Sequence, residues 1–130
     1  MTSRCRSLLL VVLLAATIST PGLAERGKTC ATDKRLVAPC YIVHGRLSAW
    51  NGSPTYRIWI IGTKRLLGVS EGNFPPDGYE ALPPQIATPV SRDMVYFGDF
   101  TVCPFQPERA GTMRLVCVAG VTNLRTTKPE

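Results

Sequence analysis

The sequence predicts a small all-β protein, a five-stranded, partly open OB-like barrel held together by disulfide bonds. Five short stretches rich in β-branched and aromatic residues are separated by segments that contain glycine or proline, and no stretch has a helical period. Three strands in a meander, a long crossover and a terminal hairpin favour a barrel. A small β-sandwich is the alternative architecture.

Residues 1–24 have the pattern of a cleaved signal peptide. Two arginines precede an apolar run, and Gly22 and Ala24 supply the small residues that precede a cleavage site. The apolar run, residues 8–18, is 11 residues long, whereas a helix that crosses a bilayer needs about 20. We therefore expect a single domain over residues 25–130, without a membrane span, in a secreted or periplasmic location.

Removal of the leader changes the cysteine count. It discards Cys5 and leaves four cysteines, Cys30, Cys40, Cys103 and Cys117. An even number in a small exported domain indicates two disulfides, and four cysteines allow three pairings. We expect at least one bridge from Cys30 or Cys40 to Cys103 or Cys117. The spacings are not those of a redox or zinc motif, so we expect no metal and no cofactor.

The first strands are predicted to form a β-meander. Residues 40–48 alternate between two sets of side chains, residues 56–61 (YRIWII) are aromatic and β-branched, and residues 65–69 form a third strand weakened at Gly68. Asn51-Gly52 is a hairpin signal between the first two strands. Strand glycines at 45, 68 and 98 favour a barrel, because sharp curvature of a sheet requires them.

The second half of the chain begins with a long loop. Residues 70–92 contain five prolines, a density that excludes a strand or helix of normal length. This loop is either a wrapping segment that covers an edge or closes a barrel end, or a functional loop. Strands are predicted at residues 94–102 and 112–118, the second with a continuation at 121–124, and the polar tail 125–130 is predicted to fray.

The residue types do not favour an enzyme. His44 is the only histidine and has no nucleophile signature beside it. A small hydrolase remains an alternative, although no two of the acids stand out as a catalytic pair: Glu71, Asp77, Asp93, Asp99 and Glu108. Without Arg4 and Arg6 the chain carries 13 basic and 9 acidic residues, a net charge of +4 that is spread along the sequence. This distribution indicates a solvated surface rather than a nucleic-acid site.

A binding site is predicted on the first two strands. His44, Arg46 and Ser48 share one face of the first strand, and Arg57, Trp59 and Ile61 share one face of the second. Pairing of these strands would create a basic and aromatic surface for a protein or a small acidic ligand, flanked by residues 71–89. The predicted binding residues are therefore Arg46, Arg57, Trp59 and His44. Alternatively, Trp59 packs in the core and the arginines lie at its rim.

Residues 44–69 and 98–118 resemble a family of small exported bacterial proteins of unknown function. The shared pattern is H-G-R, N-G-x-P, R-I-W, G-T-x-R-L-L-G-V, F-x-V-C-P and P-E-R-x-G-x-M. It is met at residues 44–46, 51–54, 57–59, 62–69, 100–104 and 107–113. The resemblance implies a shared β domain and no particular substrate. Because catalytic residue types are scarce, we expect a binding module, with a hydrolase or an enzyme inhibitor that presents the proline-rich loop as alternatives.

Overall fold

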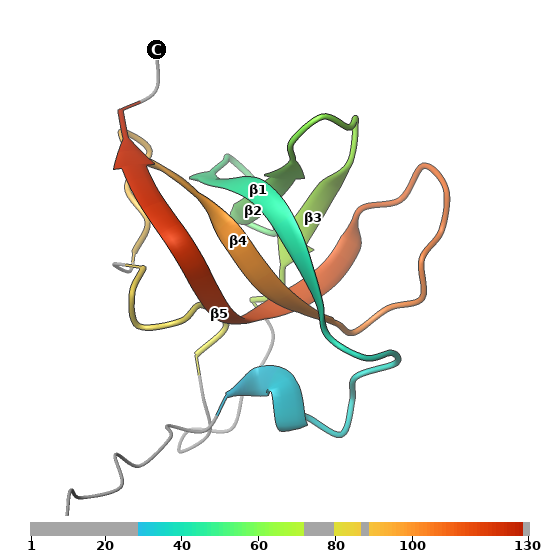
Figure 1. The fold of residues 1–130 in the computed structure, drawn as a ribbon. Coiled ribbons are helices and arrows are strands. Elements are labelled where there is room, and N and C mark those ends of the chain that lie inside the picture. The colour runs from blue at the N-terminus through green and yellow to red at the C-terminus, as the bar shows by residue number, and fades with distance from the viewer. Residues whose placement is uncertain (1–28, 72–79, 87–88, 129–130) are drawn as a thin grey trace, which may run out of the picture.

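A computed structural model describes residues 29–71, 80–86 and 89–128, and it is a closed five-stranded β-barrel (Figure 1). The predicted all-β barrel is thus confirmed, and its ring is closed where the sequence predicted a partly open one. The predicted signal peptide lies outside the described residues. The elements are a 3-10 helix, η1 (Cys30–Thr32), and strands β1 (Tyr41–Ala49), β2 (Tyr56–Ile60), β3 (Leu66–Val69), β4 (Val95–Pro104) and β5 (Arg114–Thr127).

The strands follow the order β1-β2-β3-β5-β4 around the ring. The meander β1-β2-β3 and the β4-β5 pair are antiparallel, as predicted, and β1 also pairs antiparallel with β4. The ring closes through a parallel pair between β3 and the start of β5. A parallel pair cannot be joined by a tight turn, so β5 has to reach β3 after the chain has passed through β4.

Alternation along the strands places one row of apolar side chains inside the ring. Leu47, Ile58, Leu67, Phe100 and Val116 are fully buried there, one from each strand. Their neighbours in sequence are half-buried, except Gly68 and Cys117, which are buried as well. This is the period-2 pattern expected of strands that bury one face.

The described part of the proline-rich loop packs against the barrel core. Leu82, Ile86 and Val90 are buried and belong to the same core cluster as the strands. The Val118 amide donates a hydrogen bond of 2.9 Å to the Ala81 carbonyl. Of the two readings of this loop, the structure therefore supports the wrapping segment for the residues that it describes.

The C-terminal tail differs from the prediction. Residues 125–130 were expected to fray, but Arg125 and Thr127 lie in β5 opposite Phe97 and Val95 of β4. The prediction was wrong for residues 125–127, because polar side chains alone do not indicate a frayed end. Ladder hydrogen bonds are made by the backbone, so polar side chains on an outward face are compatible with a strand.

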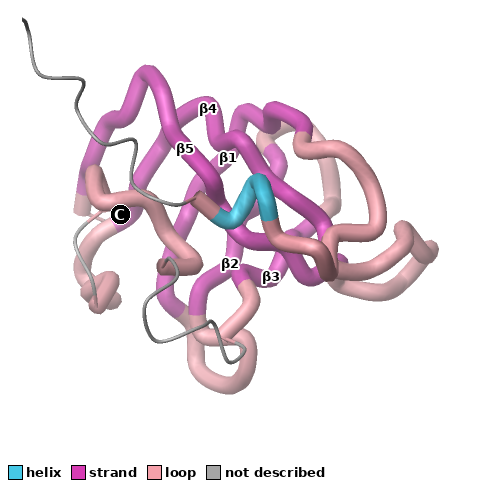
Figure 2. Tube along the Cα trace, turned by 90° about the horizontal axis from the view of Figure 1, so that it is seen from below, coloured by secondary structure: helices cyan, strands magenta, loops and turns pink. Residues whose placement is uncertain are grey.

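Two disulfides tie the N-terminal part of the described chain to the barrel. Cys30–Cys117 joins η1 to β5, and Cys40–Cys103 joins the start of β1 to β4, so the expected pairing between the two halves is confirmed. Figure 2 shows η1 lying against the barrel beside β5. In the described ranges, no helix has the length and apolarity needed to cross a bilayer.

Candidate functional site

The first arginine–tryptophan pair lies on the outer face of β1 and β2. Arg46 and Trp59 are direct cross-strand partners, and the Arg46 guanidinium carbon lies 5.7 Å from the centre of the Trp59 ring. This is a cation–π distance. Trp59 is half-buried and does not belong to the core cluster, so the alternative that it is a core residue is wrong.

A second arginine–tryptophan pair adjoins the first. Arg57 lies on β2 opposite Ser48, and its guanidinium carbon is 5.3 Å from the ring centre of Trp50. The chain has two tryptophans, and each therefore stacks with one of the two arginines predicted to bind. We call the surface made by Arg46, Trp59, Arg57 and Trp50 the arginine–tryptophan surface.

Both indole rings are fixed by hydrogen bonds of their N–H groups. Trp59 Nε1 donates to the Thr63 carbonyl at 2.7 Å, and Trp50 Nε1 donates to Ser48 Oγ at 2.9 Å. Trp50 was not among the predicted binding residues, because it lies just beyond the predicted strand and directly before the Asn51-Gly52 turn signal. The sequence did offer one indication: in an extended chain, a residue two positions beyond Ser48 lies on the same face as Ser48.

Neither arginine of this surface is neutralised within the described part of the chain. Arg57 Nε donates a hydrogen bond of 3.1 Å to the Pro54 carbonyl. The side chain of Arg46 makes no hydrogen bond or ion pair with a described residue, and its Nε is buried without a partner. A buried donor without a partner lowers the stability of the fold.

His44 is occupied by a carboxylate on the neighbouring strand. Its Nδ1 lies 2.9 Å from Asp99 Oδ1, and Asn123 Nδ2 donates to Asp99 Oδ2 at 2.7 Å. These hydrogen bonds, the one from Asn123 first, hold the pKa of Asp99 below its ordinary value. His44 shares the outer face of β1 with Arg46, but the structure directs it toward β4 rather than toward the tryptophans.

Glu71 fixes the connection between β1 and β2. Its carboxylate accepts hydrogen bonds from the Thr55 amide at 2.8 Å and from Ser53 Oγ at 3.1 Å. Hydrogen bonding by Thr55 holds the pKa of Glu71 below its ordinary value. The connection that carries Trp50 is thereby anchored to the start of the proline-rich loop.

Among the described acids considered for a hydrolase, Glu108 lines a cleft, and no second one lines it with Glu108. Asp99 and Glu71 are engaged as above, and Glu108 forms an ion pair with Arg65. Asp77 lies outside the described residues. Within residues 80–86, Leu82, Pro83 and Ile86 are buried and Pro84 and Gln85 are exposed, and an inhibitor that presents this loop stays a prediction.

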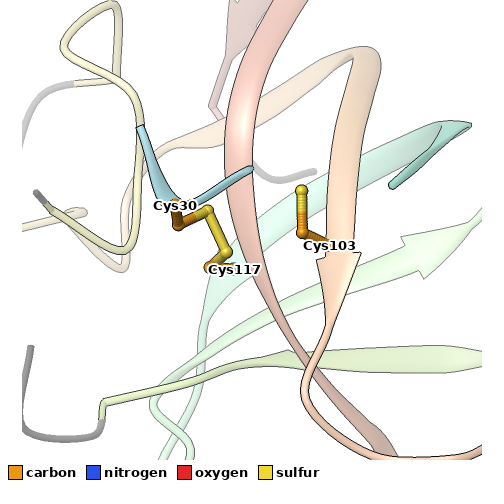
Figure 3. A group of neighbouring side chains, drawn as sticks. All are labelled: Cys30, Cys103 and Cys117. Carbon is orange, nitrogen blue, oxygen red and sulfur yellow. A yellow bond between two sulfur atoms is a disulfide. The ribbon is translucent and has the colours of Figure 1, made fainter. Parts of the chain in front are cut away.

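The four cysteines that the structure describes are paired in two disulfides, and three of them form a buried cluster. The sulfur atoms of Cys30, Cys103 and Cys117 lie within 4.8 Å of one another. Figure 3 shows the bond between Cys30 and Cys117, with Cys103 beside it. Because Cys103 is itself bonded to Cys40, these sulfurs serve as cross-links rather than as metal ligands.

Comparison with known proteins adds no assignment. No family model matches the chain, and no curated protein or solved structure is significantly similar to it. The resemblance of the sequence pattern to a family of small exported proteins therefore stays a prediction.

Proposed function

We propose that this protein is a secreted or periplasmic binding module that holds acidic groups of a partner protein on its arginine–tryptophan surface. The observation that carries the proposal is the pair of stacked arginines, Arg46 on Trp59 and Arg57 on Trp50, without a neutralising carboxylate among the described residues. The two disulfides are compatible with an oxidising compartment.

The shape of the surface favours a protein over a small molecule. It is the outer face of a barrel, whereas sites for small molecules are usually concave. Tryptophan and arginine are the residues that most often dominate the free energy of binding between proteins. Trp59 and Trp50 are held by their own hydrogen bonds, which limits the conformational entropy that binding has to remove.

A paired capture experiment tests this proposal. Wild-type protein, the double variant Arg46→Ala/Arg57→Ala and the control Arg92→Ala/Arg125→Ala are immobilised and exposed to envelope extract and culture fluid of the source cells. The control removes the same charge, and Arg125 also stacks on an aromatic ring, that of Phe97 at 5.8 Å. Partners retained by wild type and by the control but lost by Arg46→Ala/Arg57→Ala support the proposal.

The bound state is then checked by fluorescence. A partner that covers the surface reduces quenching of tryptophan emission by acrylamide, and thermal unfolding of each variant shows that it is folded. Equal recovery of every partner by wild type and by Arg46→Ala/Arg57→Ala overturns the proposal. So does a partner whose binding leaves the tryptophans as accessible to acrylamide as before.

A further inference from the structure

A basic cleft lies between the β2-β3 turn and the β4-β5 loop, the two connections that project together in Figure 1. Its volume is about 610 Å³, within the range of small-molecule sites. The turn contributes Lys64 and Arg65, and the loop contributes Glu108 and Arg109. Leu66 and Met113 supply apolar lining.

The charges of the basic cleft are unbalanced. Arg65 forms an ion pair with Glu108, which links the turn to the loop. Lys64 and Arg109, one on each wall, form no ion pair with a described residue. A smaller cleft of about 210 Å³ shares Arg109 and adds Arg114, so the excess of positive charge continues along the loop.

The turn that carries two of these cations is held in a fixed shape. Thr63 Oγ1 donates to the Ile60 carbonyl at 2.8 Å and accepts from the Arg65 amide at 3.0 Å. Gly62 has a φ of +79°, a backbone conformation that residues with a side chain rarely adopt. A turn backbone that is already fixed favours binding, because binding has less backbone freedom to remove.

We infer that the basic cleft binds a small anion with at least two phosphate or sulfate groups. One anionic group contacts Lys64 and the other contacts Arg109. Glu108 limits the affinity, because its carboxylate repels the anion and keeps Arg65 in an ion pair. The inference does not depend on the proposed function, because the cleft and the arginine–tryptophan surface share no residue. Phosphate and sulfate esters carry the same charge and geometry, so the two sources are separated by experiment.

The test measures binding of two probes, tripolyphosphate and a trisulfated disaccharide, by calorimetry at constant ionic strength. Lys64→Ala and Arg109→Ala should each weaken binding about fivefold, as expected for an exposed charge pair. The matched control Arg92→Ala should change it less than twofold. Glu108→Gln should strengthen binding, whereas Asp93→Asn, with the same change of charge, should not.

The outcomes are distinct. Binding of either probe with this pattern supports the inference, and the tighter probe identifies the anion. No binding by wild type, or equal losses in Arg92→Ala and Arg109→Ala, overturns it. Arg46→Ala/Arg57→Ala should bind the probe as wild type does. If that variant loses the probe instead, the anion belongs to the arginine–tryptophan surface and the inference about the cleft is wrong.

Discussion

Cys103 of β4 and Cys117 of β5 are direct cross-strand partners, yet each is bonded to a cysteine from the N-terminal part of the chain. Their sulfur atoms lie within 4.8 Å of each other. Two bridges therefore meet at one point of the β4-β5 pair, where a third pairing is within reach once the N-terminal partners are removed.

We predict that the double variant Cys30→Ser/Cys40→Ser forms a Cys103–Cys117 disulfide, because cross-strand partners lie at a separation that a disulfide spans. Mass spectrometry of a non-reduced digest should detect the linked peptides. Wild type, as the control, should give Cys30–Cys117 and Cys40–Cys103 alone. Persistent thiols at Cys103 and Cys117 after air oxidation would contradict the prediction.

Removal of one whole disulfide should lower the free energy of unfolding by about 2–4 kcal/mol. Cys30 and Cys117 are 87 residues apart, and Cys40 and Cys103 are 63 apart. Because the cost of loop closure grows only with the logarithm of length, Cys30→Ala/Cys117→Ala and Cys40→Ala/Cys103→Ala should differ by less than about 1 kcal/mol. Urea unfolding measures the free energy of unfolding of both variants. A much larger difference between them would show that the packing of η1, rather than loop closure, determines the loss of stability.

Gly45 allows β1 to pass over the core. A Cβ atom at this position would lie 2.5 Å from Cγ2 of Ile58, which is fully buried and branched and cannot move aside. Gly45→Ala should therefore destabilise the protein by about 1–3 kcal/mol through overpacking. Gly120→Ala is the matched control, since nothing lies within 4 Å of its Cβ position. Equal stability of the two variants in urea would refute the prediction.

The Arg46–Trp59 stack should contribute a measurable coupling energy. A double-mutant cycle of Arg46→Ala and Trp59→Leu should give about 0.5–1 kcal/mol, the value of an exposed cation–π pair. The same cycle on Arg125 and Phe97, whose separation is nearly equal, provides the comparison. A coupling energy of zero would mean that the contact between Arg46 and Trp59 does not stabilise the arginine–tryptophan surface.

Asp99 should make stability depend on pH in the acidic range. Its pKa is lowered in the folded state, chiefly by Asn123 and then by His44. The stability that it contributes is therefore present above the unfolded pKa, about 3.9, and is lost as the pH falls through the folded value. The difference in Tm between wild type and Asp99→Asn should shrink as the pH is lowered from 5 to 2.

The variant Asn123→Gly tests whether the hydrogen bond from Asn123 causes the pH dependence attributed to Asp99. It removes the principal hydrogen bond to Asp99, and glycine accepts the φ of 52° that Asn123 adopts. This variant should also show a weaker dependence of Tm on pH than wild type. An unchanged dependence in both variants would assign the acid sensitivity of the protein to other carboxylates.

The sequence predicted the strands because alternation is a local property of the chain. Residues 41–49 and 95–104 show it clearly, and it grouped Arg46 with His44 and Trp59 with Arg57, but it left open whether Trp59 faces the core or the outside. Ring closure through β3 and β5 and the burial of Leu82 and Ile86 depend on contacts between distant segments. The basic cleft was missed for the same reason, since Lys64 and Arg109 meet only after the barrel has closed.

The closed ring also limits how a partner can attach. Each of the five strands has a hydrogen-bonded neighbour on both sides over part of its length. β5 pairs with β3 only at residues 114–116, so its residues 119–127 have a strand neighbour on the β4 side alone. Strand addition, which reads a peptide through its backbone, is therefore confined to this free edge of β5. On the paired parts of the wall recognition has to use side chains, so a few substitutions there can redirect specificity without altering the fold.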